Sequence, residues 1–409
     1  MNNIDARSLL LINNYHYRRG GADAVYLEHE ELFRAAGWDT ASFSMQHPKN
    51  IDSEFSDYFV DEIEFGQDYG MLDKLRMAGK IIYSKEARDK MARLLDNVPV
   101  DVAHIHNVHH HISPSILPLL HERGIPVALT AHDLKLLCPA YTMLSNGEVC
   151  ERCGNGAVWN TATRKCIKNS TALSSLIALE SAIHRILGIY RKNVSKVVTP
   201  SRFYQQKFEQ YGWPAEQVAY IPNYVRVDEF TTQFEAGDYF VFIGRLSYEK
   251  GIATLVEAAE SSGVKLVIVG DGPLRESLSA KAEAASADIE FAGFQSGDNL
   301  FRLVRESRAL VIPSEWYENA PISVLEAYAC GKPVIGARIG GIPELISENE
   351  TGWLFESGSV DALSGVLRRV AELPGATVTA AGKAARERVE RFHTPQHYLD
   401  SMLELYSKF

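Results

Sequence analysis

Two glutamates eight positions apart mark the stretch SEWYENAPISVLEA (314–327). Glu318 comes just before a predicted helix that Pro321 is well placed to begin, and Glu326 lies about five residues into it, roughly 7–8 Å further along the axis. A carboxylate accepts hydrogen bonds but repels phosphate, so the pair is suited to the hydroxyls of a sugar or a ribose. Helix capping by Glu318 and a solvent-exposed position for Glu326 are the alternative interpretations.

Two cations follow the predicted strand YFVFIG (239–244). In GRLSYEKG, Arg245 and Lys250 stand at the strand end, and Gly251 eases entry to the next helix. Positive charges beside the N–H groups of a helix start are suited to a diphosphate. An exposed arginine and lysine with no ligand are the alternative.

Two further predicted strands also end in residues of interest. VIVGDGPLRESL contains Gly270 and Gly272, which permit a tight turn and close approach of the backbone, although ordinary turn chemistry explains them equally well. PVALTAH ends at His132, at the carboxyl end of a strand, where ligands of such sheets bind. A histidine bonded within the fold is the alternative.

Four cysteines form the pattern C-x11-C-x2-C-x12-C in a loop-like, Gly/Asn-rich segment. They are Cys138, Cys150, Cys153 and Cys166. Four thiolates that include a CxxC pair fit a small tetrahedral zinc site of structural type. Free or redox-active thiols are the alternative.

A rival chemistry comes from HIHNVHHH (104–111), because His-x-His after a strand is typical of metal-dependent amidohydrolases. A metal-dependent amidohydrolase would need further His or Asp ligands on later strands. After His132 only His184, His393 and His397 remain, and none lies at a clear strand end. The pattern therefore disfavours a metallohydrolase.

Short β-branched runs alternate with helical patterns along all 409 residues, which predicts parallel sheets covered by helices on both faces. We expect two doubly wound domains of Rossmann type, at 1–230 and 231–390, because the polar stretch TTQFEAGDY (231–239) precedes a fresh strand. The last segment, 391–409, is expected to be a helix that packs back on the first domain. The cysteine segment 138–166 is then an insertion in the first domain.

Composition narrows the class of protein. A hydrophobic content of 46% with 23% charged residues is typical of a globular chain, and a net charge of −10 argues against a nucleic-acid binder. No run of 18 apolar residues occurs, and the N-terminus lacks the features of a signal peptide. We therefore expect a cytoplasmic protein with reduced cysteines.

A basic stretch interrupts this acidic chain. Residues 185–207 contain six basic groups and no acid, and the amphipathic segment LIALESAIHRILGIY (176–190) precedes and overlaps them. Such a segment (176–207) could dock the first domain on the anionic inner face of the cell membrane. A solvated helix face is the alternative.

Several of these motifs occur in a characteristic order. Gly244-Arg245 with Glu249-Lys250-Gly251 is followed by Gly270-Asp271-Gly272, by PSEWYENAPISVLEAYACGKPVIG with its Glu-x7-Glu, and by GGIPELI and TGWLF. In this order the chain resembles the retaining glycosyltransferases of family 4. That resemblance implies the GT-B fold, in which two Rossmann-like domains face each other across a cleft. Gly20-Gly21, His132 and IPNYVRVDEF (221–230) extend it weakly to the first domain.

The resemblance also implies residue roles. Arg245 and Lys250 would hold the donor diphosphate, and Glu326 would bind the ribose of a UDP- or GDP-sugar. Glu318 would contact the transferred sugar, helped by the backbone N–H groups of Asn319 and Ala320. Gly20 and Gly21 would let their loop approach the phosphates, and His132 would lie beside the sugar. Asp23 stands where the family often has Glu, so its role is open.

The function expected from this reading is retaining sugar transfer to a lipid-linked or polysaccharide acceptor in cell-surface glycan synthesis. No Asp-x-Asp signature stands at a strand end, so no cofactor is expected in the chemistry, and zinc would be structural only. Two alternatives remain. They are a sugar-nucleotide epimerase of the same fold and a non-catalytic subunit that binds nucleotide sugars.

Overall fold

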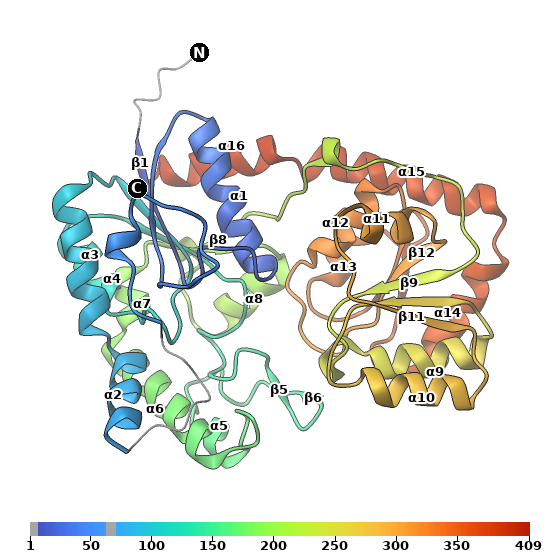
Figure 1. The fold of residues 1–409 in the computed structure, drawn as a ribbon, viewed down its shortest axis with the longest axis horizontal. Coiled ribbons are helices and arrows are strands. Elements are labelled where there is room, and N and C mark those ends of the chain that lie inside the picture. The colour runs from blue at the N-terminus through green and yellow to red at the C-terminus, as the bar shows by residue number, and fades with distance from the viewer. Residues whose placement is uncertain (1–6, 63–70) are drawn as a thin grey trace.

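Two parallel six-stranded sheets, each flanked by helices, form the computed structural model of the protein (Figure 1). The structure describes residues 7–62 and 71–409, so residues 1–6, where a signal peptide would begin, lie outside the described part. The expected GT-B arrangement of two Rossmann-like domains is confirmed.

The first sheet has the order β2-β1-β3-β4-β7-β8. Its strands are β1 (Ser8–Asn13), β2 (Asp39–Phe43), β3 (Val102–Asn107), β4 (Val127–Thr130), β7 (Lys196–Thr199) and β8 (Val218–Tyr220). Its helices are α1 (Gly21–Ala35), α2 (Met71–Ile82), α3 (Lys85–Asn97), α4 (Ile116–Glu122), α5 (Asn160–Thr163), α6 (Thr171–Leu187), α7 (Ile189–Asn193) and α8 (Arg202–Gln210). The small hairpin of β5 (Leu144–Ser145) and β6 (Glu148–Val149) lies in the cysteine insertion.

The second sheet has the order β11-β10-β9-β12-β13-β14. Its strands are β9 (Phe240–Ile243), β10 (Leu266–Val269), β11 (Ile289–Gly293), β12 (Ala309–Ile312), β13 (Val334–Ala337) and β14 (Gly352–Phe355). Its helices are α9 (Ile252–Ser262), α10 (Arg275–Ala284), α11 (Gly297–Arg305), α12 (Ile322–Ala329), α13 (Ile342–Leu345), α14 (Val360–Glu372) and α15 (Gly375–Phe392), and α16 (Pro395–Tyr406) follows.

Burial explains why these runs form central strands. Leu9 to Ile12 of β1 are completely buried, as are nearly all residues of β10 and β12, because helices cover both faces of each sheet. A strand buried on both faces needs apolar side chains at successive positions, not alternate ones. The continuous apolar runs in the sequence therefore predict parallel strands correctly.

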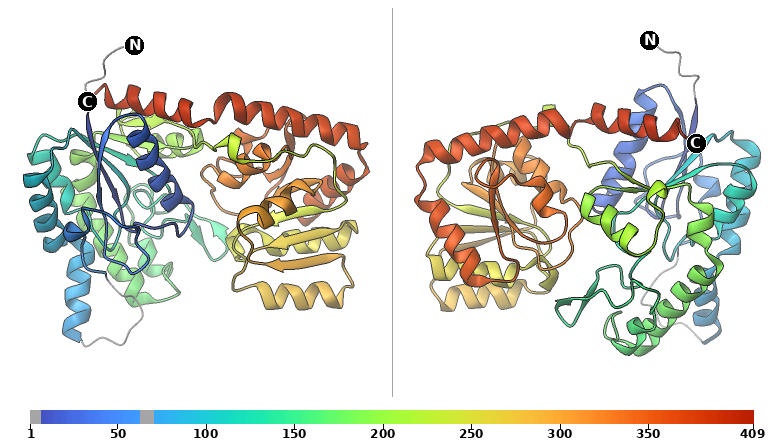
Figure 2. Two further views of the ribbon diagram at one scale, coloured as in Figure 1. Left: turned by 45° about the horizontal axis from the view of Figure 1, so that its top comes forward. Right: turned by 180° about the vertical axis from the view of Figure 1, so that it is seen from behind.

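The last helix returns to the first domain, as expected. Helix α15 follows the second domain and α16 continues across to the first, where it packs on α1 (Figure 2). Tyr398, Met402 and Tyr406 are buried there among the side chains of β1 and α1. At the α15–α16 junction the carbonyl of His393 accepts a hydrogen bond of 3.0 Å from the backbone N–H of Val225. The two segments that connect the domains, one at Val225 and one at His393, are thus hydrogen-bonded to each other.

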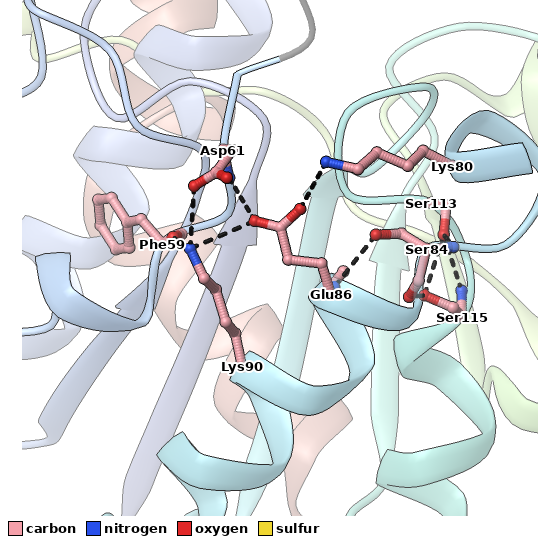
Figure 3. Close-up of polar contacts among 9 residues, drawn as sticks. Phe59, Asp61, Lys80, Ser84, Glu86, Lys90, Ser113 and Ser115 are labelled. Atoms are coloured by element: carbon pink, nitrogen blue, oxygen red, sulfur yellow. Dashed lines mark hydrogen bonds and ion pairs between the residues drawn. The ribbon is translucent and has the colours of Figure 1, made fainter. Parts of the chain in front are cut away.

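The outer part of the first domain is held by a polar cluster around Glu86 and Ser84 (Figure 3). The Glu86 carboxylate accepts hydrogen bonds from the Lys80 ammonium at 2.8 Å and from the Asp61 backbone N–H at 2.7 Å. Ser84 caps α3 and is bonded through its backbone to the hydroxyls of Ser113 and Ser115. This cluster fixes α2 and α3 far from the facing sheet edges.

No helix in the described ranges is both long and apolar enough to cross a membrane.

Candidate active site

Lys250 and Glu318 meet in the second domain. Strands β9 and β12 are neighbours where the strand order reverses, and the loops that follow them carry the two residues. The Lys250 Nζ lies 2.6 Å from the Glu318 Oε1, and the Ser314 hydroxyl donates a hydrogen bond of 2.8 Å to the same oxygen. Only 7% of Glu318 is exposed. Ligands of open α/β sheets bind at such a switch point, so both residues lie where a donor would be expected.

Arg245 is exposed on the same loop as Lys250. Its charge reaches Tyr141 of the cysteine insertion in the first domain. Burial raises the pKa of the Tyr141 phenol, Asp133 and Glu249 raise it further, and Arg245 lowers it. The insertion and the Arg245 loop therefore face each other across the two domains.

Gly270 and Gly272 act through backbone packing. Gly270 has φ +136°, and a Cβ there would lie 1.9 Å from the Gly244 carbonyl oxygen. A Cβ on Gly272 would lie 2.4 Å from the carbonyl oxygen of Leu246. These two glycines let the β10 loop pack against the loop that carries Arg245. The two glycines thus help to position the Arg245 loop, and their contact with a donor stays a prediction.

Glu315, the acid nearest to Glu318 in sequence, has a different environment. Its Oε1 accepts a hydrogen bond of 2.5 Å from the hydroxyl of Thr254, in the first turn of α9. Its backbone N–H bonds the Glu249 carbonyl at 2.9 Å. Glu315 therefore secures the start of α9, whereas Glu318 bonds the cation.

Glu326 lies in α12, five residues into the helix, and faces the first domain. The helix begins at Ile322, so Pro321 occupies the cap position and not the first helical position that the sequence predicted. The pKa of Glu326 is raised to about 7, mainly by burial and also by Glu28, against a smaller decrease from Arg18, and both of these residues belong to the first domain. The start of α12 thus lies at the domain interface. The Glu326 carboxyl group changes its protonation state near neutral pH.

Asn319 joins the two domains through its side chain. Its Nδ2 donates a hydrogen bond of 2.9 Å to the Ala131 carbonyl, and its Oδ1 accepts one of 2.9 Å from Ser201. The carbonyl of Ala320 accepts a further bond of 3.0 Å from Asn223. The sequence assigned Asn319 and Ala320 only for their backbone N–H groups; the structure adds a domain-joining contact next to His132.

Gly20 and Gly21 begin α1 opposite α12. A Cβ on Gly21 would lie 3.9 Å from the Ile322 side chain, and one on Gly20 would lie 3.9 Å from the Asp23 carboxylate. Neither residue has a positive φ that would call for glycine. Asp23 accepts a hydrogen bond of 2.9 Å from Asn13, which ties the first turn of α1 to the end of β1.

His132 carries a neutral imidazole. Burial lowers its pKa to about 4, so the ring carries no charge at neutral pH. Its Nε2 lies 3.0 Å from the Nδ1 of His106 on β3, so one ring donates a hydrogen bond to the other. His106 therefore holds the ring of His132 in its orientation.

The His-x-His pattern belongs to a buried core network beneath α16. His104 and His106 point to one face of β3, where His29 of α1 joins them, and the three rings bring ligand atoms within 4.8 Å of one another. Both ring nitrogens of His29 and of His104 already have hydroxyl partners. These partners are Tyr398, Tyr406 and Thr130. The pattern is thus explained by packing of the C-terminal helix, and not by hydrolase chemistry.

The four cysteines of the insertion carry free thiols. Cys138 and Cys153 are buried, and Cys150 and Cys166 are half-buried. Cys330, in contrast, is buried in the core of the second domain. The insertion lies outside both sheets, between β4 and α6.

Two family models divide the chain between them. The model described as Glycosyltransferase Family 4 matches residues 19–229, which is half of the chain, and the model described as Glycosyl transferases group 1 matches residues 227–388. The chain belongs to glycosyltransferase family 4. The boundary between the two matches lies at the linker into the second domain.

Other glycosyltransferases are similar to this family 4 chain over part of their length. The amylovoran biosynthesis glycosyltransferase AmsK of Erwinia amylovora is 29% identical over 46% of this chain and 50% of its own. The lipopolysaccharide 1,2-N-acetylglucosaminetransferase of Salmonella typhimurium is 30% identical over 43% of this chain and 53% of its own. The matches thus span about half of those relatives.

Solved structures show the same fold. Sucrose-phosphate synthase from Thermosynechococcus elongatus has a TM-score of 0.72 at 19% identity and covers 98% of each chain. Anabaena HepE, in complex with UDP and glucose, has a TM-score of 0.68 at 16% identity and covers 98% of this chain and 100% of its own.

Sequence reasoning missed several residues of this family 4 site. The Asn319 side chain, His106 and Glu151 of the insertion make their contacts with residues more than 20 positions away. The pairing of His106 with His132 had a weak signal, since both are histidines at the ends of neighbouring strands. For Asn319 and Glu151 the sequence holds no signal, because nothing local specifies which distant surface they meet.

Proposed function

We propose that this chain is a retaining glycosyltransferase that moves a sugar from a UDP- or GDP-sugar to a lipid-linked or polysaccharide acceptor in cell-surface glycan synthesis. The observation that carries the proposal is the Lys250–Glu318 pair at the switch point of the second sheet. A cation for phosphate and a carboxylate for hydroxyls side by side match the two halves of a sugar diphosphate.

The residues divide the chemistry as follows. Lys250 and Arg245 neutralise the charge that develops on the leaving diphosphate, aided by the N–H groups at the start of α9. Glu318 holds hydroxyls of the transferred sugar, and Glu326 binds the ribose. His132 is neutral and lies beside the sugar as a hydrogen-bonding group oriented by His106. Closure of the two domains excludes water.

In the proposed reaction the acceptor hydroxyl attacks the sugar from the same face that the diphosphate leaves, so the anomeric configuration is retained. No side chain is nominated as a covalent nucleophile, and the departing phosphate takes the proton of the acceptor hydroxyl as the new glycosidic bond forms. The reaction needs no cofactor in this account, because positioned charges and hydrogen bonds supply the stabilisation.

Relatives guide the acceptor class. The Erwinia protein is named for amylovoran biosynthesis and the Salmonella protein for lipopolysaccharide. An uncharacterised Klebsiella pneumoniae protein of a cps region is 25% identical over 83% of this chain and 87% of its own. These names support a surface-glycan acceptor.

The proposed place of action is the cytoplasmic face of the cell membrane. Helix α6 exposes Leu179, Ile186 and Leu187, and 82% of Ile186 is accessible. Arg191 and Lys207 are engaged within the protein, by the Tyr211 carbonyl and the Glu151 carboxylate, which leaves the apolar side chains and Lys192 for an anionic surface. Ile186→Asp should reduce cosedimentation with anionic vesicles several-fold, and unchanged cosedimentation would contradict the contact.

A donor panel tests the function. Purified protein is incubated with UDP- and GDP-sugars, with and without a membrane lipid extract. Acceptor-dependent release of nucleoside diphosphate is the expected result, and the anomeric configuration of the product, read by NMR, tests retention. An interconverted sugar without acceptor would indicate the epimerase, and binding without turnover across the panel would indicate the non-catalytic subunit.

A further inference from the structure

The cysteine insertion reaches the second domain through one carboxylate. The β5–β6 hairpin extends from the first domain toward the second (Figure 1). Next to it, Glu151 accepts a hydrogen bond of 2.5 Å from the hydroxyl of Tyr317. Tyr317 directly precedes Glu318, the proposed sugar-binding residue. The insertion therefore contacts the donor loop itself.

Glu151 is also tied to the first domain. Its second oxygen accepts a hydrogen bond of 2.6 Å from Tyr211, and the Lys207 ammonium lies 2.5 Å from the first. Burial raises the pKa of Glu151, but the bonds from Lys207, Tyr211 and Tyr317 together lower it below its usual value. The carboxylate thus stays ionised and links the two domains, a contact that we call the Glu151 bridge.

Little regular structure supports the turn that carries Glu151. Two strands of two residues and the four-residue helix α5 are its neighbours. Tyr141, Met143, Asn146 and Lys165 all have positive φ in this segment, and Trp159 is exposed. Short segments of this kind, with few buried apolar side chains, usually depend on a cross-link for a fixed conformation.

The four cysteines surround this turn. Cys150 and Cys153 flank Glu151 on either side, and the Cys150 N–H bonds the Met143 carbonyl at 2.7 Å. Cys153 and Cys166 are bound to one another through Thr161, whose hydroxyl lies 3.6 Å from the Cys153 sulfur and whose carbonyl accepts the Cys166 N–H at 3.1 Å.

The base of the insertion is anchored independently. The ammonium of Lys135 donates to the Pro139 carbonyl at 3.1 Å and lies 2.9 Å from Glu180 on α6, and both charged groups are buried. Cys138 directly precedes Pro139, and its backbone N–H donates a hydrogen bond of 2.7 Å to the Leu134 carbonyl. The Cys138 thiol is therefore fixed to the body of the first domain. The other three thiols belong to the part of the insertion that has little regular structure.

The thiols are close enough to interact electrostatically. The pKa of Cys138 is raised to about 12, mainly by burial and in smaller part by the nearby Cys153 and Cys166. Burial also raises the pKa of Cys166, with additional increases from Cys153 and Cys150. Four sulfur ligands gathered in one short segment are a set that selects zinc over calcium or magnesium.

We propose that Cys138, Cys150, Cys153 and Cys166 bind one zinc(II) ion, and that this structural site holds the Glu151 bridge in place. Zinc replaces four thiol protons, which are released to solvent, and the site carries a net charge of −2. Arg185, which donates to the Gly154 carbonyl at 3.1 Å, and Arg164 lie near enough to offset that charge. Tetrahedral coordination places sulfurs about 3.8 Å apart. Only His29, His104 and His106 form a described three-ligand group within 4.8 Å, so zinc would draw the thiols closer than they stand here.

Zinc content tests the site without any assay of activity. The full-length protein is prepared without a metal-affinity tag in reducing buffer, and zinc per chain is measured by mass spectrometry. One zinc per chain is expected. Cys153→Ser should lose it, whereas Cys330→Ser, which changes the one cysteine outside the insertion, should keep it. A folded wild-type chain without zinc after zinc-supplemented growth, or one with disulfides between these cysteines, would overturn the proposal.

Chelation covers the case in which Cys153→Ser does not fold. Removing zinc from the wild-type protein with a strong chelator should lower its melting temperature, and adding zinc back should restore it. A wild-type melting temperature that does not change while zinc is removed would show that the metal has no structural role.

The Glu151 bridge is tested separately from the zinc site. Only its effect on catalysis rests on the proposed function. Glu151→Gln should keep one zinc but increase amide hydrogen exchange in the peptide that spans Tyr317 and Glu318 at least several-fold. Glu148→Gln, an exposed change in the same hairpin, should alter neither. Unchanged exchange in the Glu151 variant would overturn the bridge, whether or not a transferase activity has been found.

Discussion

The Nζ of Lys250 lies 2.6 Å from the Oε1 of Glu318, so the phosphate-binding and sugar-binding groups of the proposed site neutralise each other. A bound donor would give each a new partner. The pair thus pre-positions both groups and keeps the buried carboxylate satisfied.

Replacing Glu318 tests this arrangement. Glu318→Ala removes the sugar contact and leaves Lys250 without its partner, so kcat should fall at least about 100-fold while the fold survives. The control is Glu350→Ala, which changes an exposed carboxylate of the same domain and should retain the activity. Wild-type turnover of Glu318→Ala with a native melting curve would count decisively against the role of Glu318.

Glu326 should make donor binding depend on pH. Its pKa is raised to about 7 by burial, and only the ionised form accepts two hydroxyl bonds from a ribose. The ionised fraction rises about tenfold between pH 6 and pH 8, so the donor KM should fall by about that factor.

Glu326→Gln should remove this dependence, and Glu350→Gln, an exposed change in the same domain, should preserve it. Because folding raises this pKa, ionisation of Glu326 reduces stability as the pH rises. The Gln variant should therefore be at least as stable as the wild type at pH 8, which separates weak binding from misfolding. A KM that is flat across this range in the wild type would contradict the assignment.

The buried histidines should make the fold sensitive to acid. Burial lowers the pKa of His29 to about 3, whereas the unfolded chain has a histidine pKa near 6.5. Folded His29 therefore binds no proton between pH 6.5 and pH 3 while the unfolded chain does, and stability falls as the pH falls through that window. Each such histidine contributes a loss of about 2 kcal/mol in unfolding free energy between pH 7 and pH 5.

Urea denaturation at the two pH values measures the effect. His29→Asn should reduce the difference between pH 7 and pH 5, and His121→Asn, at an exposed position, should leave it unchanged. Equal stability of the wild-type protein at both pH values would show that the cluster takes up protons without unfolding.

Gly270 should tolerate no side chain. Alanine there would place its Cβ 1.9 Å from the Gly244 carbonyl oxygen in an unfavourable backbone conformation, so the Arg245 loop would have to move. We expect Gly270→Ala to destabilise the second domain by about 3 kcal/mol or more and to weaken donor binding.

Gly263→Ala provides the comparison, because it also has a positive φ but meets nothing within 4 Å. It should cost only about 1 kcal/mol, in the range of left-handed strain alone. Similar melting temperatures for the two variants would contradict the packing argument.

Sequence alone determined the strands, the presence of a helix shortly after Glu318 and the eight-residue spacing to Glu326. These depend on local periodicity, turn chemistry and helical rise, which neighbouring residues specify. The order of the motifs identified the family. The sequence also placed Lys250 and Glu318 in the loops that follow two predicted strands.

Tertiary structure alone decided which strand ends meet and what each residue contacts. Strand order at the switch point joins Lys250 to Glu318 across 68 positions. Asn319 and Glu151 find partners in the opposite domain, and His106 finds His132 on the next strand. Such contacts depend on how whole layers pack, and burial, which sets the pKa of Glu326, arises only when the domains come together.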